Sequence, residues 1–213
     1  MATYDLDEQE RLDELKAWWK RWGNLVMVGL AVAVAAAAGW RYWQNQVVTQ
    51  SLEAATVYEQ LTRSLAANDA KAARDAGAML IDQYQGTAYA PRAALLLAKL
   101  NVGAKDLKSA QAQLEWAVAN SKEPAVKDLA RLRLAGVQLD QKQYDAAMKT
   151  LSATHSDAFA FRFHDLKGDV LQAQGKPAEA RAAYQAAFGK MAEDNAYRNI
   201  VELKLDALGG EAK

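Results

Sequence analysis

The feature that most constrains this chain is one uncharged run, WGNLVMVGLAVAVAAAAGW, from Trp22 to Trp40. As an α-helix this run is about 28 Å long, close to the hydrocarbon thickness of a bilayer. Every later apolar stretch is interrupted by charged residues within a few positions. The sequence therefore predicts a single transmembrane helix, which we place at residues 22–43 so that it includes the aromatic residues after the run.

Basic residues flank this run unequally, which predicts its orientation. Four precede it, at Arg11, Lys16, Lys20 and Arg21. Only Arg41 follows it before Arg63. Because Lys and Arg near a span are retained in the cytoplasm, residues 1–21 are predicted to form a cytoplasmic segment, with the long C-terminal part on the other side of the membrane.

A cleaved signal peptide is the alternative interpretation of the run, since residues 33–38 offer small side chains for cleavage. The segment before the run is long and mostly acidic, whereas a signal peptide begins with a short basic region. The run also continues into Trp40, Tyr42 and Trp43, which are typical of an aromatic belt at a membrane interface. These features favour an uncleaved anchor.

Two patterns in and around the predicted span bear on its environment. Five of the six tryptophans bracket it, as expected for rings at headgroup level: Trp18, Trp19, Trp22, Trp40 and Trp43. Ala31, Ala35 and Gly39 recur every four residues and form a candidate face for packing against another membrane helix. An Ala-rich segment also produces this spacing by chance.

Composition excludes several classes of function. The chain has 26 basic and 26 acidic residues, so no basic face is indicated and nucleic acid is not an expected partner. It has no cysteine, which removes disulfides, thiol catalysis and thiolate metal sites.

The part after residue 47 is predicted to be a helical repeat. It is rich in Ala, Leu, Gln, Glu, Lys and Arg and has no run with the alternation of a strand. Three sets of residues share the same first two offsets and recur after 37 and then 33 residues, which brackets the 34-residue tetratricopeptide period. They are Ala98, Ala110 and Leu114; Ala135, Ala147 and Leu151; and Gly168, Ala180 and Tyr184.

These patterns predict an all-α protein, with a single N-terminal transmembrane helix followed by a tetratricopeptide-like α-solenoid. Residues 44–90 are expected to form membrane-proximal helices and an N-terminal cap. Residues 91–190 would form three degenerate repeats, and residues 191–213 a C-terminal capping helix and tail. Gly175 is expected at an inter-helix turn, where its positive φ is tolerated. Asn101 and Gln138 depart from the motif, because a large apolar residue is usual there.

Signals for catalysis are sparse. His155 and His164 are the only histidines, and their spacing resembles no known metal motif. No glycine-rich phosphate loop or Gly-x-Ser-x-Gly turn is present. Phe159, Phe161 and Phe163 form either a recognition patch or core filling at a repeat junction, and we favour core filling. A solenoid of this type binds peptides or helices in a groove, which predicts an adaptor or scaffold, with no enzyme activity and no cofactor or metal.

The arrangement resembles the YfgM-like family, ancillary subunits of the bacterial Sec translocon. The resemblance rests on the acidic leader, the anchor ending in GWRYWQNQ (Gly39–Gln46) and the segment RLRLAGVQLDQKQYDAAMKTL (Arg131–Leu151), and covers essentially the whole chain. It implies a single-pass protein of the bacterial inner membrane with a periplasmic repeat domain. The implied partners are the Sec translocon, a membrane-anchored periplasmic chaperone of prolyl-isomerase type and exported client chains.

Two alternative functions remain open at the level of sequence. One is a stress-response regulator that acts through the acidic, amphipathic segment DLDEQERLDELKAWW in the predicted cytoplasmic part. Deleting only that segment would then change signalling while export association survives. The other is a general envelope-assembly scaffold.

Overall fold

A computed structural model of the chain describes the backbone of residues 3–209 and the side chains of residues 10–209. Within this range it contains helices and no strand. The α-helices are α1 (Thr3–Ala66), α2 (Ala70–Gln83), α3 (Tyr89–Gly103), α4 (Leu107–Asn120), α5 (Pro124–Asp140), α6 (Tyr144–Leu151), α7 (Ala160–Ala173), α8 (Pro177–Gly189) and α9 (Arg198–Ala207). One 3₁₀ turn, η1 (Asp157–Phe159), precedes α7. The expected tail at residues 210–213 and the first two residues of the leader lie outside the described range.

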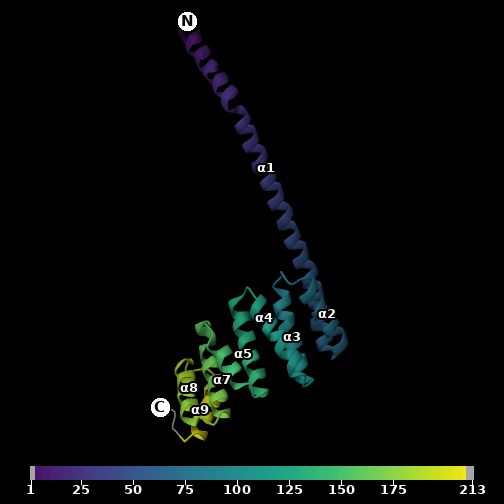
Figure 1. The fold of residues 1–213 in the computed structure, drawn as a ribbon, viewed down its shortest axis with the longest axis vertical. Helices are drawn as coiled ribbons and strands as arrows, with labels where there is room; N and C mark the ends of the chain where they lie inside the picture. The colour runs from purple at the N-terminus through teal and green to yellow at the C-terminus, as the bar shows by residue number, and fades with distance from the viewer. Residues whose placement is uncertain (1–2, 210–213) are drawn as a thin grey trace. The chain divides into compact units, whose positions relative to one another are not determined.

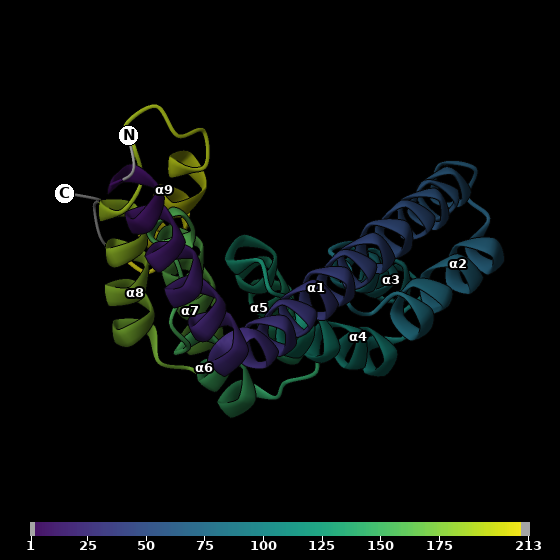
Figure 2. The same cartoon turned by 90° about the horizontal axis from the view of Figure 1, so that it is seen from above.

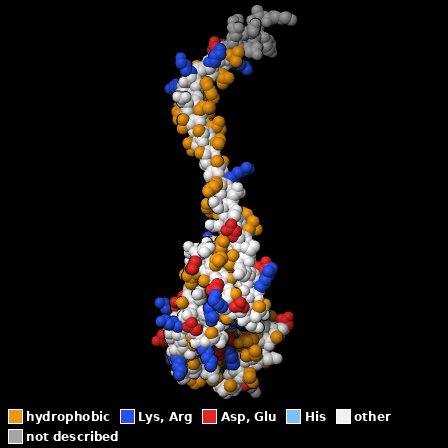
Figure 3. Space-filling model, turned by 90° about the vertical axis from the view of Figure 1, so that its right-hand side faces the viewer, with side chains coloured by type: hydrophobic (Ala, Val, Ile, Leu, Met, Phe, Trp, Pro, Cys, Tyr) orange, Lys and Arg blue, Asp and Glu red, His pale blue; other side chains and the backbone are white. Residues whose placement is uncertain are grey.

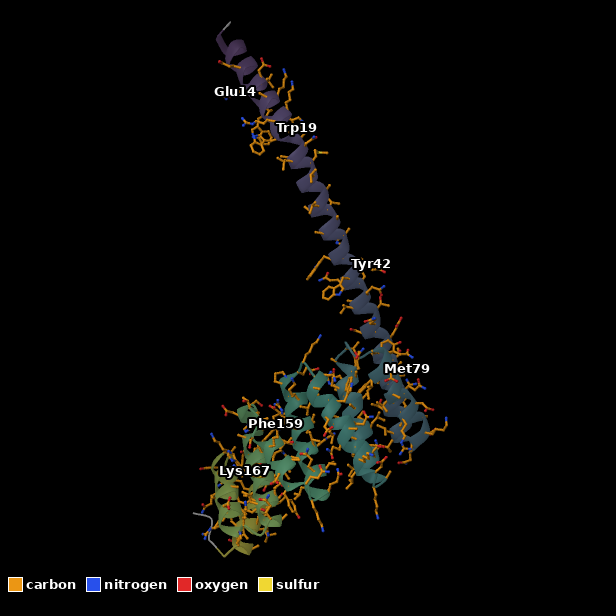
Figure 4. The ribbon with its side chains drawn as sticks, viewed as in Figure 1. Glu14, Trp19, Tyr42, Met79, Phe159 and Lys167 are labelled. Atoms are coloured by element: carbon orange, nitrogen blue, oxygen red, sulfur yellow. The ribbon has the colours of Figure 1, made fainter. Side chains whose placement is uncertain are left out.

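The chain forms two compact units, residues 1–50 and residues 51–213. The first unit consists of the N-terminal part of α1, whose apolar side chains are exposed, as Figure 3 shows in orange. Trp19 and Tyr42 stand out from this helix near the two ends of the apolar run (Figure 4). Among the described residues, α1 is the one helix long and apolar enough to cross a membrane.

The second unit is an array of antiparallel helix pairs. Helix α3 pairs with α4, α5 with α6, and α7 with α8, and α9 packs on α8. The end of α1 shares a hydrophobic cluster with α2, which includes Leu61 and Leu80. The helices from α2 to α8 follow one another in chain order across the unit, and α9 lies beside α7 and α8 (Figures 1 and 2). Because neighbours alternate in direction, α3, α5 and α7 begin at the same edge of this unit. The prediction of an all-α, tetratricopeptide-like fold is confirmed.

The four pairs share one type of turn. The residue two positions after the odd-numbered helix has a positive φ: 58° at Asn68, 60° at Lys105, 58° at Lys142 and 75° at Gly175. The next residue donates its backbone N–H to the carbonyl five residues earlier, at 2.9, 2.9, 2.8 and 3.0 Å respectively. This is the Schellman termination, which satisfies helix carbonyls that would otherwise lack donors.

The first pair, which the sequence left outside the three repeats, therefore has the same construction as the other three. At two core positions the residue sizes are exchanged. The first pair has a large side chain where the other pairs have a small residue, and a glycine where the other pairs have a large side chain. Leu61 and Gly77 lie 37 residues before Ala98 and Leu114. Both Leu61 and Gly77 are buried. A β-carbon on Gly77 would lie 2.7 Å from the Leu97 side chain of the next pair, so any larger residue here would force Leu97 to move. This exchange of sizes hides the repeat from sequence comparison.

The three phenylalanines near the start of α7 fill the core, as we favoured. Phe163 is only 2% exposed and belongs to the cluster around Leu132 and Ala147. Phe159 packs against the same cluster, whereas Phe161 packs against the cluster around Tyr184. They serve two neighbouring junctions, so they do not form one recognition patch.

Candidate interaction surface

The residues that define the predicted repeat lie inside the array. Nine of them are buried between helices: Ala98, Ala110, Leu114, Ala135, Ala147, Leu151, Gly168, Ala180 and Tyr184. Gly175 is exposed at the α7–α8 turn with a φ of 75°. The two polar departures, Asn101 and Gln138, are also buried, and the Gln138 side-chain carbonyl accepts a hydrogen bond from the Thr150 hydroxyl at 2.8 Å. These residues determine how the helices pack against one another, and Ala98 and Leu114 also border an open hollow between helices.

One open surface with an apolar lining is a groove between the odd-numbered helices. It consists of two hollows of about 380 and 760 Å³ that share Lys99, and we call it the odd-helix groove. The smaller hollow lies over α3 and α5, and the larger lies between α1, α2 and α3. Their apolar lining is Leu65, Leu96, Leu100, Val102, Leu114 and Val137. Sequence reasoning expected a groove but did not identify its lining.

The charges around the odd-helix groove are mainly positive. Arg74, Lys99 and Arg133 line it, against one carboxylate, Asp140. Arg133 donates to the backbone carbonyl of Leu95 at 3.2 Å, which holds its side chain across α3. None of the three cations forms an ion pair within the described residues. The groove therefore suits a segment that combines apolar and acidic side chains.

A second polar feature lies under the C-terminal helix. Lys204 of α9 donates to Asp165 and Asp169 of α7, both at 2.7 Å. The Tyr184 hydroxyl donates to Asp169 at 2.7 Å, and the Tyr197 hydroxyl donates to Asp165 at 3.0 Å. We call these five residues the α7–α9 network.

Burial and neighbouring carboxylates determine the proton affinities in this network. Burial opposes the charge on Lys204, but its hydrogen bonds to Asp165 and Asp169 and their charges outweigh that effect and raise its pKa. Burial, together with Asp169, raises the pKa of Tyr184. Burial, together with Asp165, also raises the pKa of Tyr197. The network holds α7, α8 and α9 together.

The two histidines are separated by their surroundings. His155 lies in the loop before η1 and stacks on Phe163, with ring centroids 4.2 Å apart. His164 lies in α7, where burial, reinforced by the positive charges of His155 and Lys167, lowers its pKa. Among the described residues, no group of three His, Asp or Glu side chains is placed to hold a metal ion.

The predicted membrane helix-packing face is exposed along α1. Ala31, Ala35 and Gly39 contact no other helix in the described part of the chain, and a β-carbon on Gly39 would have no neighbour within 4 Å. The face stays a prediction. At the two ends of the run, Trp18 lies 6.3 Å from Trp19 and Trp40 lies 5.3 Å from Trp43, measured between ring centroids.

Comparison with known proteins agrees with this architecture. The sequence model of the family described as tetratricopeptide repeat-like domain matches residues 16–210. A protein of Neisseria gonorrhoeae, named ancillary SecYEG translocon subunit, is 32% identical over 209 residues, which cover 98% of this chain and 100% of the relative. The chain belongs to the family of ancillary SecYEG translocon subunits.

Two further members of the ancillary SecYEG translocon subunit family extend the comparison. The Haemophilus influenzae protein is 30% identical and covers 87% of this chain and 90% of its own length. The Escherichia coli protein is 29% identical and covers 98% of this chain and 99% of its own length. The Escherichia coli match extends over nearly the whole chain, and the family model begins at residue 16, so both include the apolar run as well as the repeats.

Proposed function

We propose that this chain is a single-pass inner-membrane adaptor of the Sec translocon. In this proposal its repeat unit lies in the periplasm and links exported chains to periplasmic chaperones, including a membrane-anchored chaperone of prolyl-isomerase type. The observation that carries the proposal is the near full-length similarity to proteins named ancillary SecYEG translocon subunits. The chain combines the same two parts, an apolar helix and a repeat unit.

The physical logic of an adaptor fits these two parts. An anchor confines the repeat unit to the membrane surface, which raises its effective concentration near any partner in the same membrane. Weak contacts then suffice for capture, and weak contacts also permit rapid release. The odd-helix groove offers such a surface, because it is shallow, apolar along its floor and bordered by Arg74, Lys99 and Arg133.

Co-purification from mild detergent tests the proposal. The full chain, tagged at its C-terminus, is solubilised from membranes, and the captured translocon and chaperone subunits are quantified by mass spectrometry. We expect both to co-purify with the wild-type chain. The double variant Lys99→Glu and Val102→Asp reverses a charge and adds another within the groove, so it should reduce chaperone or client capture by about tenfold.

The matched control is Met79→Asp with Lys149→Glu. Both residues are exposed on even-numbered helices, outside the odd-helix groove (Met79 is labelled in Figure 4). The control variant should capture chaperone and client proteins as well as the wild-type chain does. A wild-type chain that co-purifies without translocon subunits would refute the adaptor role, and co-purification with a cytoplasmic response regulator in their place would favour the regulator.

A further inference from the structure

A basic pocket lies at the edge of the second unit where the odd-numbered helices begin. It has a volume of about 350 Å³ and lies between the start of α5 and the loop that precedes η1. Its polar lining, which defines the basic pocket below, includes Lys122, Lys127, Asp128, Arg131, His155 and Ser156. It shares no lining residue with the odd-helix groove.

The single carboxylate of the pocket is already neutralised. Asp128 is 3% exposed, and its Oδ2 accepts from the Ser156 backbone N–H at 2.9 Å and from the Ser156 hydroxyl at 3.0 Å. Its Oδ1 accepts from Arg131 at 3.2 Å, and the same Arg131 nitrogen donates to the Thr154 carbonyl at 2.8 Å. These bonds fix the loop and the guanidinium, so the wall of the pocket is preorganised.

The two lysines of the pocket remain without a counter-ion. Lys122 and Lys127 form no ion pair within the described residues, whereas the neighbouring Glu123 is engaged by Arg92 at 2.7 Å. The next acid in the loop, Asp157, is exposed and does not line the pocket. The pocket therefore holds an excess of positive charge at Lys122 and Lys127 beside the fixed guanidinium of Arg131, which is the chemistry that recognises an oxyanion such as a phosphate group.

The position of this edge indicates where the phosphate group comes from. The second unit begins at this same edge. Two side-chain contacts connect residues near its start with residues beside the pocket. Tyr84, at the end of α2, donates to Glu53 at 3.3 Å, and Arg92, at the start of α3, pairs with Glu123 beside the pocket. Ser51, where the second unit begins, follows Trp43 by eight positions. A chain segment of that length spans at most about 28 Å, which limits the distance between Ser51 and the end of the predicted membrane helix.

We propose that the basic pocket binds the phosphate headgroup of an anionic phospholipid. The proposal rests on the membrane anchoring proposed above but not on association with the translocon. Lys122 and Lys127 supply the unpaired charge, and Arg131 supplies fixed donors. Lysine side chains are attracted electrostatically to anionic lipid surfaces. Bound headgroups would hold the edge of the repeat unit at the membrane surface.

Nuclear magnetic resonance of the full chain in nonionic-detergent micelles tests this proposal. The backbone amides of residues 122–131 and 154–156 are followed during titration with short-chain phosphatidylglycerol, phosphatidylcholine, inorganic phosphate or a hexaglutamate peptide. We expect saturable shifts with phosphatidylglycerol and none with phosphatidylcholine. The variant Lys122→Gln with Lys127→Gln should weaken phosphatidylglycerol binding by at least about tenfold.

The matched control is Lys142→Gln with Lys176→Gln. These two lysines are exposed at turns of the opposite edge and form no ion pair in the described part of the chain. Binding by the control should stay within about twofold of wild type. The unchanged spectra of both variants outside the substituted sites would show that they fold.

Three outcomes would overturn the proposal. Equal shifts with both lipids would mean insertion without headgroup recognition. Inorganic phosphate that binds as tightly as phosphatidylglycerol would identify a free-anion site, and tighter binding of hexaglutamate would identify an acidic-peptide site. Because no translocon is present in the experiment, failure here would leave the adaptor role untouched.

Discussion

Gly168 determines how closely α7 and α8 approach each other. A β-carbon at this position would lie 2.4 Å from the Tyr184 ring, which is itself fully buried. The ring cannot move away freely, because its hydroxyl donates to Asp169 at 2.7 Å and also lies 2.9 Å from the side-chain oxygen of Gln172. A single absent methyl group thus allows a tyrosine in a position where the other two predicted repeats carry leucine.

We therefore expect Gly168→Ala to destabilise the repeat unit by about 2 kcal/mol, the usual cost of forcing a methyl group into a packed core. Urea unfolding of the full chain in micelles, followed by circular dichroism, measures this. Gly136→Ala is the control, since a β-carbon there meets nothing within 4 Å. In a helix interior that change should stabilise by about 0.5–1 kcal/mol. Equal stability of the two variants would contradict our account.

At the scale of elements, the turns between paired helices differ in how well their residues tolerate a positive φ. Gly175 adopts its φ of 75° without steric cost, whereas Lys142 adopts 58° with a β-carbon. Asn68 and Lys105 occupy the equivalent turns. The fold imposes this conformation, because the tight turn delivers the following N–H to the end of the preceding helix.

Substitutions at two of these turns should have opposite effects. Gly175→Ala should lower the free energy of unfolding by about 1 kcal/mol, and Lys142→Gly should raise it by about 0.5–1 kcal/mol. Thermal unfolding of the full chain in micelles measures both. If Lys142→Gly instead lowers the stability, then the strain relieved at residue 142 is smaller than the conformational entropy that the glycine adds to the unfolded chain.

The α7–α9 network attaches the last helix to the array, and its proton affinities predict alkaline sensitivity. The folded state raises the pKa of Lys204, Tyr184 and Tyr197, so it retains protons that the unfolded chain releases above about pH 10. The stabilisation that these three groups contribute is fully present below that pH. It is lost as the pH rises through the pKa values that the groups have in the folded state.

Lys204→Met tests the network. It leaves the carboxylates of Asp165 and Asp169 without their cation, and the Asp165 side chain is only 7% exposed. Losing a partner of a fully buried pair costs about 3–5 kcal/mol, and we expect about 2 kcal/mol here because Lys204 is partly exposed. Urea unfolding at pH 7 and 10.5 should show this loss at pH 7 and a smaller difference at pH 10.5. An undiminished difference at pH 10.5 would argue against the ionic contribution.

At the scale of the whole molecule, the central prediction is orientation. The chain has no cysteine, so each introduced cysteine is the single thiol. Glu14→Cys and Lys176→Cys place it at exposed positions in the first and second units. In cells with a permeabilised outer membrane, a membrane-impermeant maleimide should label Lys176→Cys and not Glu14→Cys, because the basic flank is retained in the cytoplasm. The reverse pattern would invert the proposed topology.

The sequence by itself determined the class of fold and the three repeats nearest the consensus. An uncharged run of bilayer length and a fixed order of small and large residues are properties of the chain alone, so both can be read without a structure. Only the tertiary structure decided the first pair, where Leu61 and Gly77 exchange sizes across one junction. It alone also assembled the α7–α9 network and the basic pocket, whose members lie up to about 40 residues apart. Local periodicity carries no information about side chains that meet only when successive helix pairs stack.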